Sequence, residues 1–109
     1  MATDQIAEDF FNPNHKVLVD YLRSSGKLLV CIDYCIEKGL LSIDDREDLA
    51  AINDVKKGEK GRKLLQILHR NIACGGGEEG LEKFKKILRD DLKYDKEFKK
   101  PEKGNGFTD

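Results

Sequence analysis

Residues 38–52 read KGLLSIDDREDLAAI and combine the end of one helix, the start of another and a dense group of acids. Gly39 stands where a preceding helix would end, because glycine readily adopts the positive φ found just beyond helix C-termini. Ser42 precedes Asp45 by three residues, which is the spacing of a capping box, so a new helix is expected over residues 43–55. Acids in its first turn suit the positive end of the helix dipole.

The N-terminal part of the chain predicts a helix with alternative beginnings. Asn12 is a suitable N-cap and Pro13 suits the first helical position, so a helix is expected from residue 13. Residues 1–12 then form an N-terminal extension or the first half of the same helix, bent at Pro13. The next helix is expected to point a run of apolar side chains inward: Leu28, Leu29, Ile32 and Ile36.

The second half of the chain predicts further helices, because apolar residues recur at helical spacing in residues 62–72 and 81–92. The glycine-rich stretch CGGGEEG, residues 74–80, predicts a flexible connection between them. A last short helix is expected around Tyr94 and Phe98, and residues 99–109 are expected to form a flexible polar tail. The sequence therefore predicts one all-α domain of six helices over residues 13–98.

Composition narrows the classes of protein that the chain can belong to. Its 109 residues carry a net charge of −1, so bulk attraction to nucleic acid or anionic lipid is not expected. No apolar run approaches the roughly 20 residues of a membrane span, and the N-terminus lacks a secretion signal. The three cysteines are an odd number without a disulfide pattern. They indicate reduced thiols and a cytoplasmic protein.

Few residues suggest catalysis or metal binding. The chain has two histidines and no nucleophile elbow, phosphate-binding loop or dinucleotide fingerprint, so neither enzymatic activity nor a cofactor is expected. Cys31 and Cys35 are four residues apart on one helix, and His69 could approach from another helix to complete a zinc site. The zinc site is the less favoured interpretation, because it has only three ligands and no C-x-x-C pair. Both cysteines are explained more simply as small side chains on the buried side of a helix.

Charge is sorted along the chain into an acidic and a basic block. Residues 33–54 carry seven acids against two basic residues, whereas residues 56–70 carry six basic residues against one acid. The basic block lacks interleaved aromatic residues, so nucleic-acid binding is a less favoured alternative. The blocks are either two solvated helix faces or two surfaces through which one molecule meets the next. A contact between unlike surfaces can propagate into a chain of molecules.

The succession of these segments resembles the caspase recruitment domain, a family of the death-fold superfamily, over residues 14–98. The KGLLS link matches the family's connection before its third helix. Leu64, Leu65 and Leu68 match a leucine motif in its fourth helix, and Phe84 and Leu88 match a motif in its fifth. A death-effector or pyrin domain of the same superfamily is the alternative.

The resemblance implies a six-helix antiparallel Greek-key bundle without catalytic activity. Such a domain binds other domains of its own kind, or itself, and nucleates filaments in apoptotic or innate-immune signalling. The resemblance also implies that a basic face meets an acidic face. The basic positions are Lys16, Arg23, Arg62, Lys63 and Arg70, and the acidic positions are Asp33, Glu37, Asp44, Asp45, Glu47 and Asp48.

Overall fold

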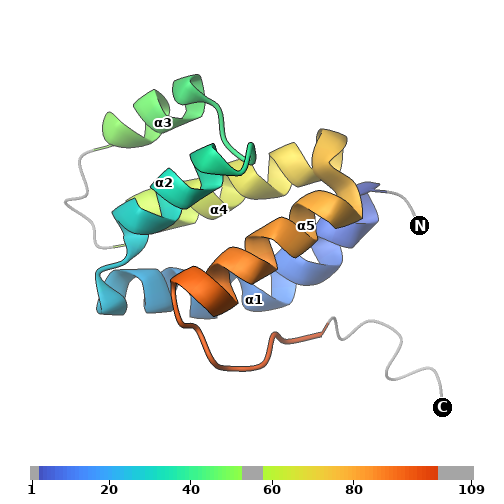
Figure 1. Ribbon diagram of the computed structural model, residues 1–109. Helices are drawn as coiled ribbons and strands as arrows, with labels where there is room; N and C mark the ends of the chain where they lie inside the picture. Colours follow the sequence, from blue (N-terminus) through green and yellow to red (C-terminus); the bar gives the residue numbers. More distant parts are fainter. Residues whose placement is uncertain (1–2, 53–57, 101–109) are drawn as a thin grey trace, which may run out of the picture.

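The computed structural model describes residues 3–52 and 58–100 and is all-α, with no strand in those two ranges (Figure 1). Its described elements are five α-helices and two π-helical turns, one after α4 and one after α5. They are α1 (Thr3–Ser25), α2 (Leu28–Glu37), α3 (Ile43–Ala50), α4 (Glu59–Asn71), η1 (Ile72–Gly76), α5 (Gly77–Lys86) and η2 (Ile87–Asp91). The all-α prediction is confirmed.

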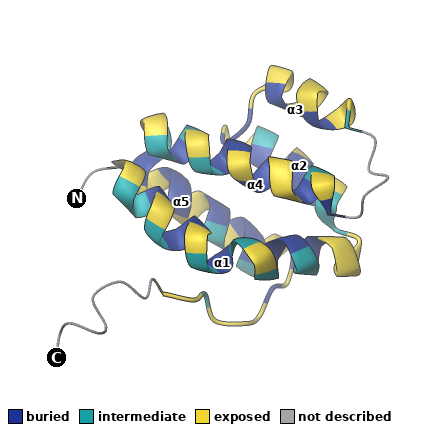
Figure 2. Cartoon of the chain, turned by 180° about the vertical axis from the view of Figure 1, so that it is seen from behind, coloured by how far each residue is buried: buried dark blue, intermediate teal, exposed yellow. Residues whose placement is uncertain are grey.

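Successive helices run in alternating directions and surround one core (Figure 1). Helix α1 packs along α4, η1 and α5, whereas the shorter α3 packs against α2 and α4. Figure 2 shows that the buried residues line the inward sides of the helices. The largest fully buried side chains are Phe11, Leu18, Leu22, Leu49, Leu64, Leu65, Leu68, Ile72, Phe84, Ile87, Leu88 and Leu92.

Helix α1 begins at Thr3 and contains Pro13, so residues 3–12 are the first half of the helix, which was one of the two predicted alternatives. The prediction that Asn12 caps the helix is therefore wrong. A proline within a helix costs about 3 kcal/mol, but burial of one large apolar side chain contributes about 1.5–3 kcal/mol. Phe10 and Phe11 are both buried in the N-terminal half of α1. The ring of Phe11 stacks on Phe84, with 5.7 Å between ring centroids, so tertiary packing maintains the helix through Pro13.

The glycine-rich residues 74–80 are helical, which corrects the predicted flexible connection. The π-helical turn η1 continues α4 as far as Gly76, and the chain turns back at Gly77, where φ is 59°. Ile72 is fully buried at the start of η1, and a Cβ at Gly80 would lie 3.5 Å from its side chain and 3.6 Å from that of Leu40. This packing orders a stretch whose composition alone is typical of a linker.

The predicted sixth helix around Tyr94 and Phe98 is absent, because residues 93–100 follow η2 as a non-helical segment. Lys93 has a φ of 60°, a left-handed conformation that ends the helical run. Side chains then bind the backbone carbonyls that a helix would have satisfied. The Tyr21 hydroxyl and the Lys27 ammonium donate to Leu92 O, and the Arg89 guanidinium donates to the carbonyls of Tyr94 and Lys96.

Asn14 anchors the end of this C-terminal segment to α1. Its side-chain amide donates to Lys99 O at 2.9 Å, and its carbonyl accepts from Lys99 N at 2.7 Å. The same amide donates to Phe10 O at 2.8 Å. Asn14 is fully buried and directly follows Pro13, so one side chain binds both the backbone of its own helix and a chain segment 85 residues away.

The Asn14→Ala variant should release this segment and destabilise the fold by about 1–3 kcal/mol, because buried hydrogen bonds are lost. Limited trypsin digestion should then cut after Lys96 and Lys99 faster than in the wild type. Asn12→Ala is the matched control, because Asn12 is exposed on the same helix. Equal cleavage rates in the two variants would show that Asn14 does not hold the segment.

Two glycines at the start of α4 should respond oppositely to alanine. A Cβ at Gly61 would meet Val19 Cγ1 at 3.6 Å, an ordinary contact, so Gly61→Ala should raise stability by about 0.4–1 kcal/mol. Gly58 has a φ of 91°, and a Cβ there would lie 3.2 Å from Arg62 Nη1. Gly58→Ala should therefore lower stability by about 1–2 kcal/mol. Urea denaturation of both variants checks the opposite signs.

Candidate protein-interaction surfaces

The link from α2 to α3 has the backbone geometry that its sequence predicts. Gly39 adopts a φ of 80°, and Leu40 N donates to Cys35 O while Gly39 N donates to Ile36 O. These two bonds form a Schellman motif. Ser42 Oγ accepts from Asp45 N at 3.0 Å, and Asp45 Oδ2 accepts from Ser42 N at 3.1 Å. The capping box is confirmed, and the two motifs together set where α3 begins.

Asp45 also joins the start of α3 to the end of α4. Its carboxylate accepts from the Asn71 amide at 3.1 Å and lies 3.2 Å from Arg70 Nη2. Asn71 in turn donates to Leu40 O at 3.0 Å. The side chain of Asp45 is only 12% exposed. Asp45 and Arg70, which the sequence assigns to opposite interaction faces, therefore bind each other within one molecule.

Hydrogen bonding lowers the pKa of Asp45 below its ordinary value. Burial of the carboxyl group acts in the opposite direction and raises the pKa, but several groups outweigh it. These are the Ser42 backbone N–H, the Asn71 amide, the Ser42 hydroxyl and the positive charge of Arg70. The folded state thus favours the ionised carboxylate, which links the stability of the protein to pH.

The remaining acidic candidates form an exposed acidic surface on α2 and α3: Asp33, Glu37, Asp44, Glu47 and Asp48. Asp33 lies 4.0 Å from Arg46, and both side chains are more than half exposed. An ion pair as exposed as this one contributes about 0–1 kcal/mol. Glu37, Asp44, Glu47 and Asp48 have no ion pair with any other residue in 3–52 or 58–100. Most of the acidic surface is therefore not neutralised by the described part of its own chain.

The remaining basic candidates form an exposed basic surface on α1 and α4: Lys16, Arg23, Arg62 and Lys63. Lys16 and Arg23 both lie within ion-pair distance of Asp20, at 3.7 and 3.4 Å. Arg62 also influences its neighbour His15. Burial lowers the pKa of His15, and the positive charges of Arg62 and His69 lower it further. His15 therefore adds little charge to the basic surface at neutral pH.

The helices that carry the two surfaces occupy different parts of the bundle. Helix α4 lies behind α2 in Figure 1, and in Figure 2, seen from behind, α1 and α4 lie toward the viewer. Helix α3 lies along the opposite edge of the molecule from α1 in both views. The Asp45–Arg70 pair joins the acidic helix α3 to the basic helix α4. Apart from the Asp45–Arg70 pair, the fold thus places the acidic block and the basic block of the sequence on separate helices.

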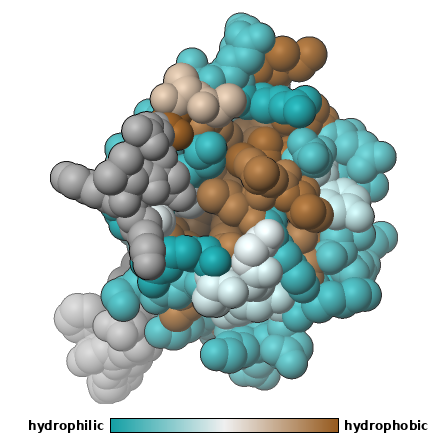
Figure 3. All heavy atoms as spheres, turned by 90° about the vertical axis from the view of Figure 1, so that its left-hand side faces the viewer, coloured by the Kyte–Doolittle hydropathy of each residue, from teal (hydrophilic) through white to brown (hydrophobic). Residues whose placement is uncertain are grey.

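An apolar end of the bundle was not foreseen from the sequence. Leu29, predicted to point inward, is 65% exposed, whereas Cys31, Ile32 and Cys35 carry the buried side of α2. Figure 3 looks at this end and shows hydrophobic residues gathered at its centre among hydrophilic ones. Residues 28–32 are all apolar, so the sequence has no alternation with polar residues that would indicate which side of α2 is buried.

The three candidate zinc ligands do not form a metal site. In the described ranges no three His, Cys, Asp or Glu side chains are arranged to hold a metal ion. Cys31 and Cys35 are buried in α2, whereas His69 stacks on Phe11 with 5.3 Å between ring centroids. The hydrogen bond with Cys31 raises the pKa of the Cys35 thiol, and burial raises it further. Both effects oppose formation of the thiolate that binds metals.

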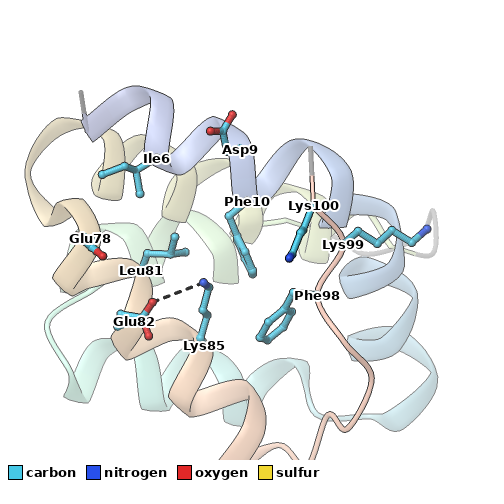
Figure 4. A pocket seen from close by; sticks show the side chains of 10 residues that line it. All are labelled: Ile6, Asp9, Phe10, Glu78, Leu81, Glu82, Lys85, Phe98, Lys99 and Lys100. Atoms are coloured by element: carbon cyan, nitrogen blue, oxygen red, sulfur yellow. Dashed lines mark ion pairs between the residues drawn. The ribbon is translucent and has the colours of Figure 1, made fainter. Parts of the chain in front are cut away.

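A groove of about 460 Å³ lies between α1, α5 and the C-terminal segment (Figure 4). Phe10, Leu81 and Phe98 supply apolar surface, and the ammonium group of Lys85 lies 5.5 Å from the ring centroid of Phe10. Lys85 also pairs with Glu82 at 3.5 Å. No histidine, cysteine or serine is among the residues that line the groove. Its lining is an apolar surface with charges of both signs around it.

Comparison of the chain with protein-family models, with curated proteins and with solved structures found no match. Among the helices that the structure describes, none has the length and apolar character needed to cross a membrane. The charged and apolar surfaces described above are therefore the basis for inferring what the protein does.

The Asp45→Asn variant should lose the stabilisation that the ionised Asp45 carboxylate gives to the folded state near neutral pH. Because the folded-state pKa is lowered, ionised Asp45 stabilises the wild type above the ordinary value of 3.8, and this stabilisation is lost as the pH falls below that value. The variant should be less stable at pH 7 by about 1 kcal/mol, and the difference from wild type should shrink in acid.

Thermal unfolding followed by circular dichroism between pH 7 and pH 2.5 measures this difference. Asp44→Asn is the control, because Asp44 is an exposed neighbour in the same helical turn. A gap between Asp45→Asn and wild type that stays constant over the whole pH range would contradict the predicted role of Asp45.

Proposed function

We propose that this protein is a homotypic protein–protein interaction module of the caspase recruitment type, which recruits partners or assembles into chains. The observation that carries the proposal is the separation of charge. The exposed acids belong to α2 and α3 and the exposed basic residues to α1 and α4, and these two pairs of helices occupy different parts of one bundle. Two copies can therefore place unlike surfaces against each other.

The contact in this proposal is between the acidic surface of one molecule and the basic surface of the next. Opposite charge speeds the encounter and sets the orientation of the two molecules. Because each molecule carries both surfaces, a contact leaves one surface free on each partner. Such a heterologous contact grows into a ring or a helical filament. A related domain that carries only one of the surfaces would bind and stop growth.

The proposed fold is the Greek-key bundle of the death-fold superfamily. Helices α1 to α5 would be the first five helices of that bundle, and residues 93–100 follow them as a non-helical segment. A death-effector or pyrin domain remains the alternative within the superfamily. The proposed setting is apoptotic or innate-immune signalling in the cytoplasm, where the free thiols of Cys31, Cys35 and Cys74 would remain reduced.

The pairing of basic residues favours a protein partner over nucleic acid. Arg70 is engaged by Asp45, and both Lys16 and Arg23 lie beside Asp20. Arg62 and Lys63 are the only two members of the predicted basic face without an ion pair to another described residue. A phosphate-binding surface works through several free cations, so this surface is better suited to a partner that offers a few carboxylates.

Charge reversal tests the proposal. Glu47→Lys and Arg62→Glu should each weaken self-association at least about tenfold at low salt, because each replaces an attraction by a repulsion. In an equimolar mixture the intact basic surface of the Glu47→Lys copy can pair with the intact acidic surface of the Arg62→Glu copy. Growth beyond that dimer should return as well, since the new lysine of one variant meets the new glutamate of the other. Sedimentation velocity over a range of protein concentrations measures both effects. Glu79→Lys and Lys86→Glu are controls with the same changes of net charge on exposed positions of α5.

Association of both variants at wild-type strength, with no gain on mixing, would show that these surfaces do not pair. Fluorescence anisotropy with labelled duplex and single-stranded DNA at low salt tests the nucleic-acid alternative. Binding that is lost in Arg62→Glu and weakens steeply with salt would favour that alternative.

A further inference from the structure

Three large apolar side chains are exposed in the described residues: Leu29 (65%), Val30 (45%) and Ile43 (66%). Leu29 and Val30 belong to the first turn of α2, and Ile43 is the first residue of α3. Scattered apolar residues on a surface need no explanation. Leu29 and Ile43 differ from scattered residues. Leu29 lines a hollow that is bordered by arginines, and Ile43 projects beside exposed acids.

Leu29 borders a hollow between α1, α2 and α4, here called the end hollow. Its apolar lining comes from Val19 and Leu22 of α1 and from Leu28 and Leu29 of α2. The hollow has a volume of about 190 Å³, several times the roughly 30 Å³ that a water molecule occupies in the liquid. Its lining residues come from the end of the bundle at which α2 begins, the end that faces the viewer in Figure 3.

Two guanidinium groups border the end hollow. Arg23 lines it, and a Cβ at Gly58, which also lines it, would lie 3.2 Å from Arg62 Nη1 and 3.8 Å from Arg23 Nη1. Both arginine side chains are exposed. Val19 and Leu22 are almost completely buried at the bottom of the hollow. Its accessible apolar surface therefore comes from half-buried Leu28 and exposed Leu29, beside the two positive charges. The end hollow therefore suits an apolar side chain with carboxylates next to it.

Ile43 offers that combination. It is followed by exposed Asp44, and Glu47 lies one helical turn further along the same side of α3. Ile43 does not line the end hollow. Helix α3 begins at its right-hand end in the upper part of Figure 1, whereas α2 begins below it at the left-hand end of the bundle. The projecting side chain and the hollow are therefore on different parts of one molecule.

We infer that Ile43 of one copy of this chain inserts into the end hollow of a second copy, with Asp44 and Glu47 beside Arg23 and Arg62. This inference rests on the proposed function, and it names the apolar centre of the contact between the two charged surfaces. The contact is heterologous, because the hollow of the first copy and the Ile43 of the second remain free. Copies therefore add to both ends of the assembly.

Single substitutions test each half of the contact. Ile43→Asp removes the projecting side chain, and Leu29→Asp puts a carboxylate at the edge of the hollow, where it repels Asp44 and Glu47. Both positions lie in the first turn of a helix, where an acid is favourable, so both variants should fold. Each should weaken self-association of the full chain at least about tenfold, because a large apolar side chain is no longer buried at the contact.

Val30→Asp is the matched control. Val30 is an exposed apolar neighbour of Leu29 in the same turn, but it lines neither the end hollow nor the adjacent hollow beside α3. The control changes net charge and hydropathy as Leu29→Asp does, and it should leave self-association within about twofold of wild type.

A mixture of the two variants is the decisive measurement. The Leu29→Asp copy keeps its Ile43, and the Ile43→Asp copy keeps its hollow, so the two should form a one-to-one dimer. That dimer cannot grow, because its free surfaces are the two altered ones. Sedimentation velocity should show monomers for each variant alone, dimers for the mixture and larger species for the wild type.

The other outcomes overturn the inference. Assembly of Ile43→Asp or Leu29→Asp at wild-type strength, or equal loss in Val30→Asp, would mean that Ile43 does not occupy the hollow. If charge reversal at Glu47 and Arg62 still weakens assembly in that case, the proposed function stands and only its apolar centre is wrong. A wild type that stays monomeric at every concentration, and is insensitive to charge reversal, would contradict both the proposed function and the insertion of Ile43 into the end hollow.

Discussion

The carboxylate of Asp45 holds α3 in place, and the acidic surface depends on it. Helix α3 has only eight residues, and Leu49 is its one fully buried apolar side chain. So short a helix is not stable by itself in water. The capping box with Ser42 fixes its first turn, and the bonds to Asn71 and Arg70 attach that turn to the end of α4. Asp44, Glu47 and Asp48 are displayed together because of this attachment.

Asp45 also shows why acidic and basic residues that are grouped along the sequence do not always form separate surfaces in the folded protein. Asp45 belongs to the acidic block and Arg70 to the basic block, yet the fold brings them together and partly buries the acid. A buried carboxylate without partners would be costly. The Ser42 N–H, the Asn71 amide and the Arg70 guanidinium therefore all bind the Asp45 carboxylate. The charges that remain for a partner are the ones that the fold leaves in solvent.

Sequence reasoning predicted the features that depend on local chemistry. Gly39 and Ser42 act through their own backbone and the next few residues, so their roles could be read directly. The start of α1 at Thr3, the ordered glycines around Gly77 and the non-helical residues 93–100 depend on distant partners. Phe11 requires Phe84, and Asn14 requires Lys99, which no local pattern reveals. Of the candidate site, the exposed charges were predictable, whereas the exposure of Leu29 was not, because neighbouring Leu28 and Ile32 are equally apolar.

The charges and the apolar end have different parts in any assembly. Exposed ion pairs contribute about 0–1 kcal/mol each and are screened by salt, so a few pairs cannot overcome the loss of translational and rotational freedom on association. Burial of a large aliphatic side chain contributes about 1.5–3 kcal/mol and is not screened. Apolar contacts alone, however, would not distinguish one orientation from another. Because Leu29 lies beside Arg23 and Ile43 lies beside Asp44, orientation and affinity can come from the same contact.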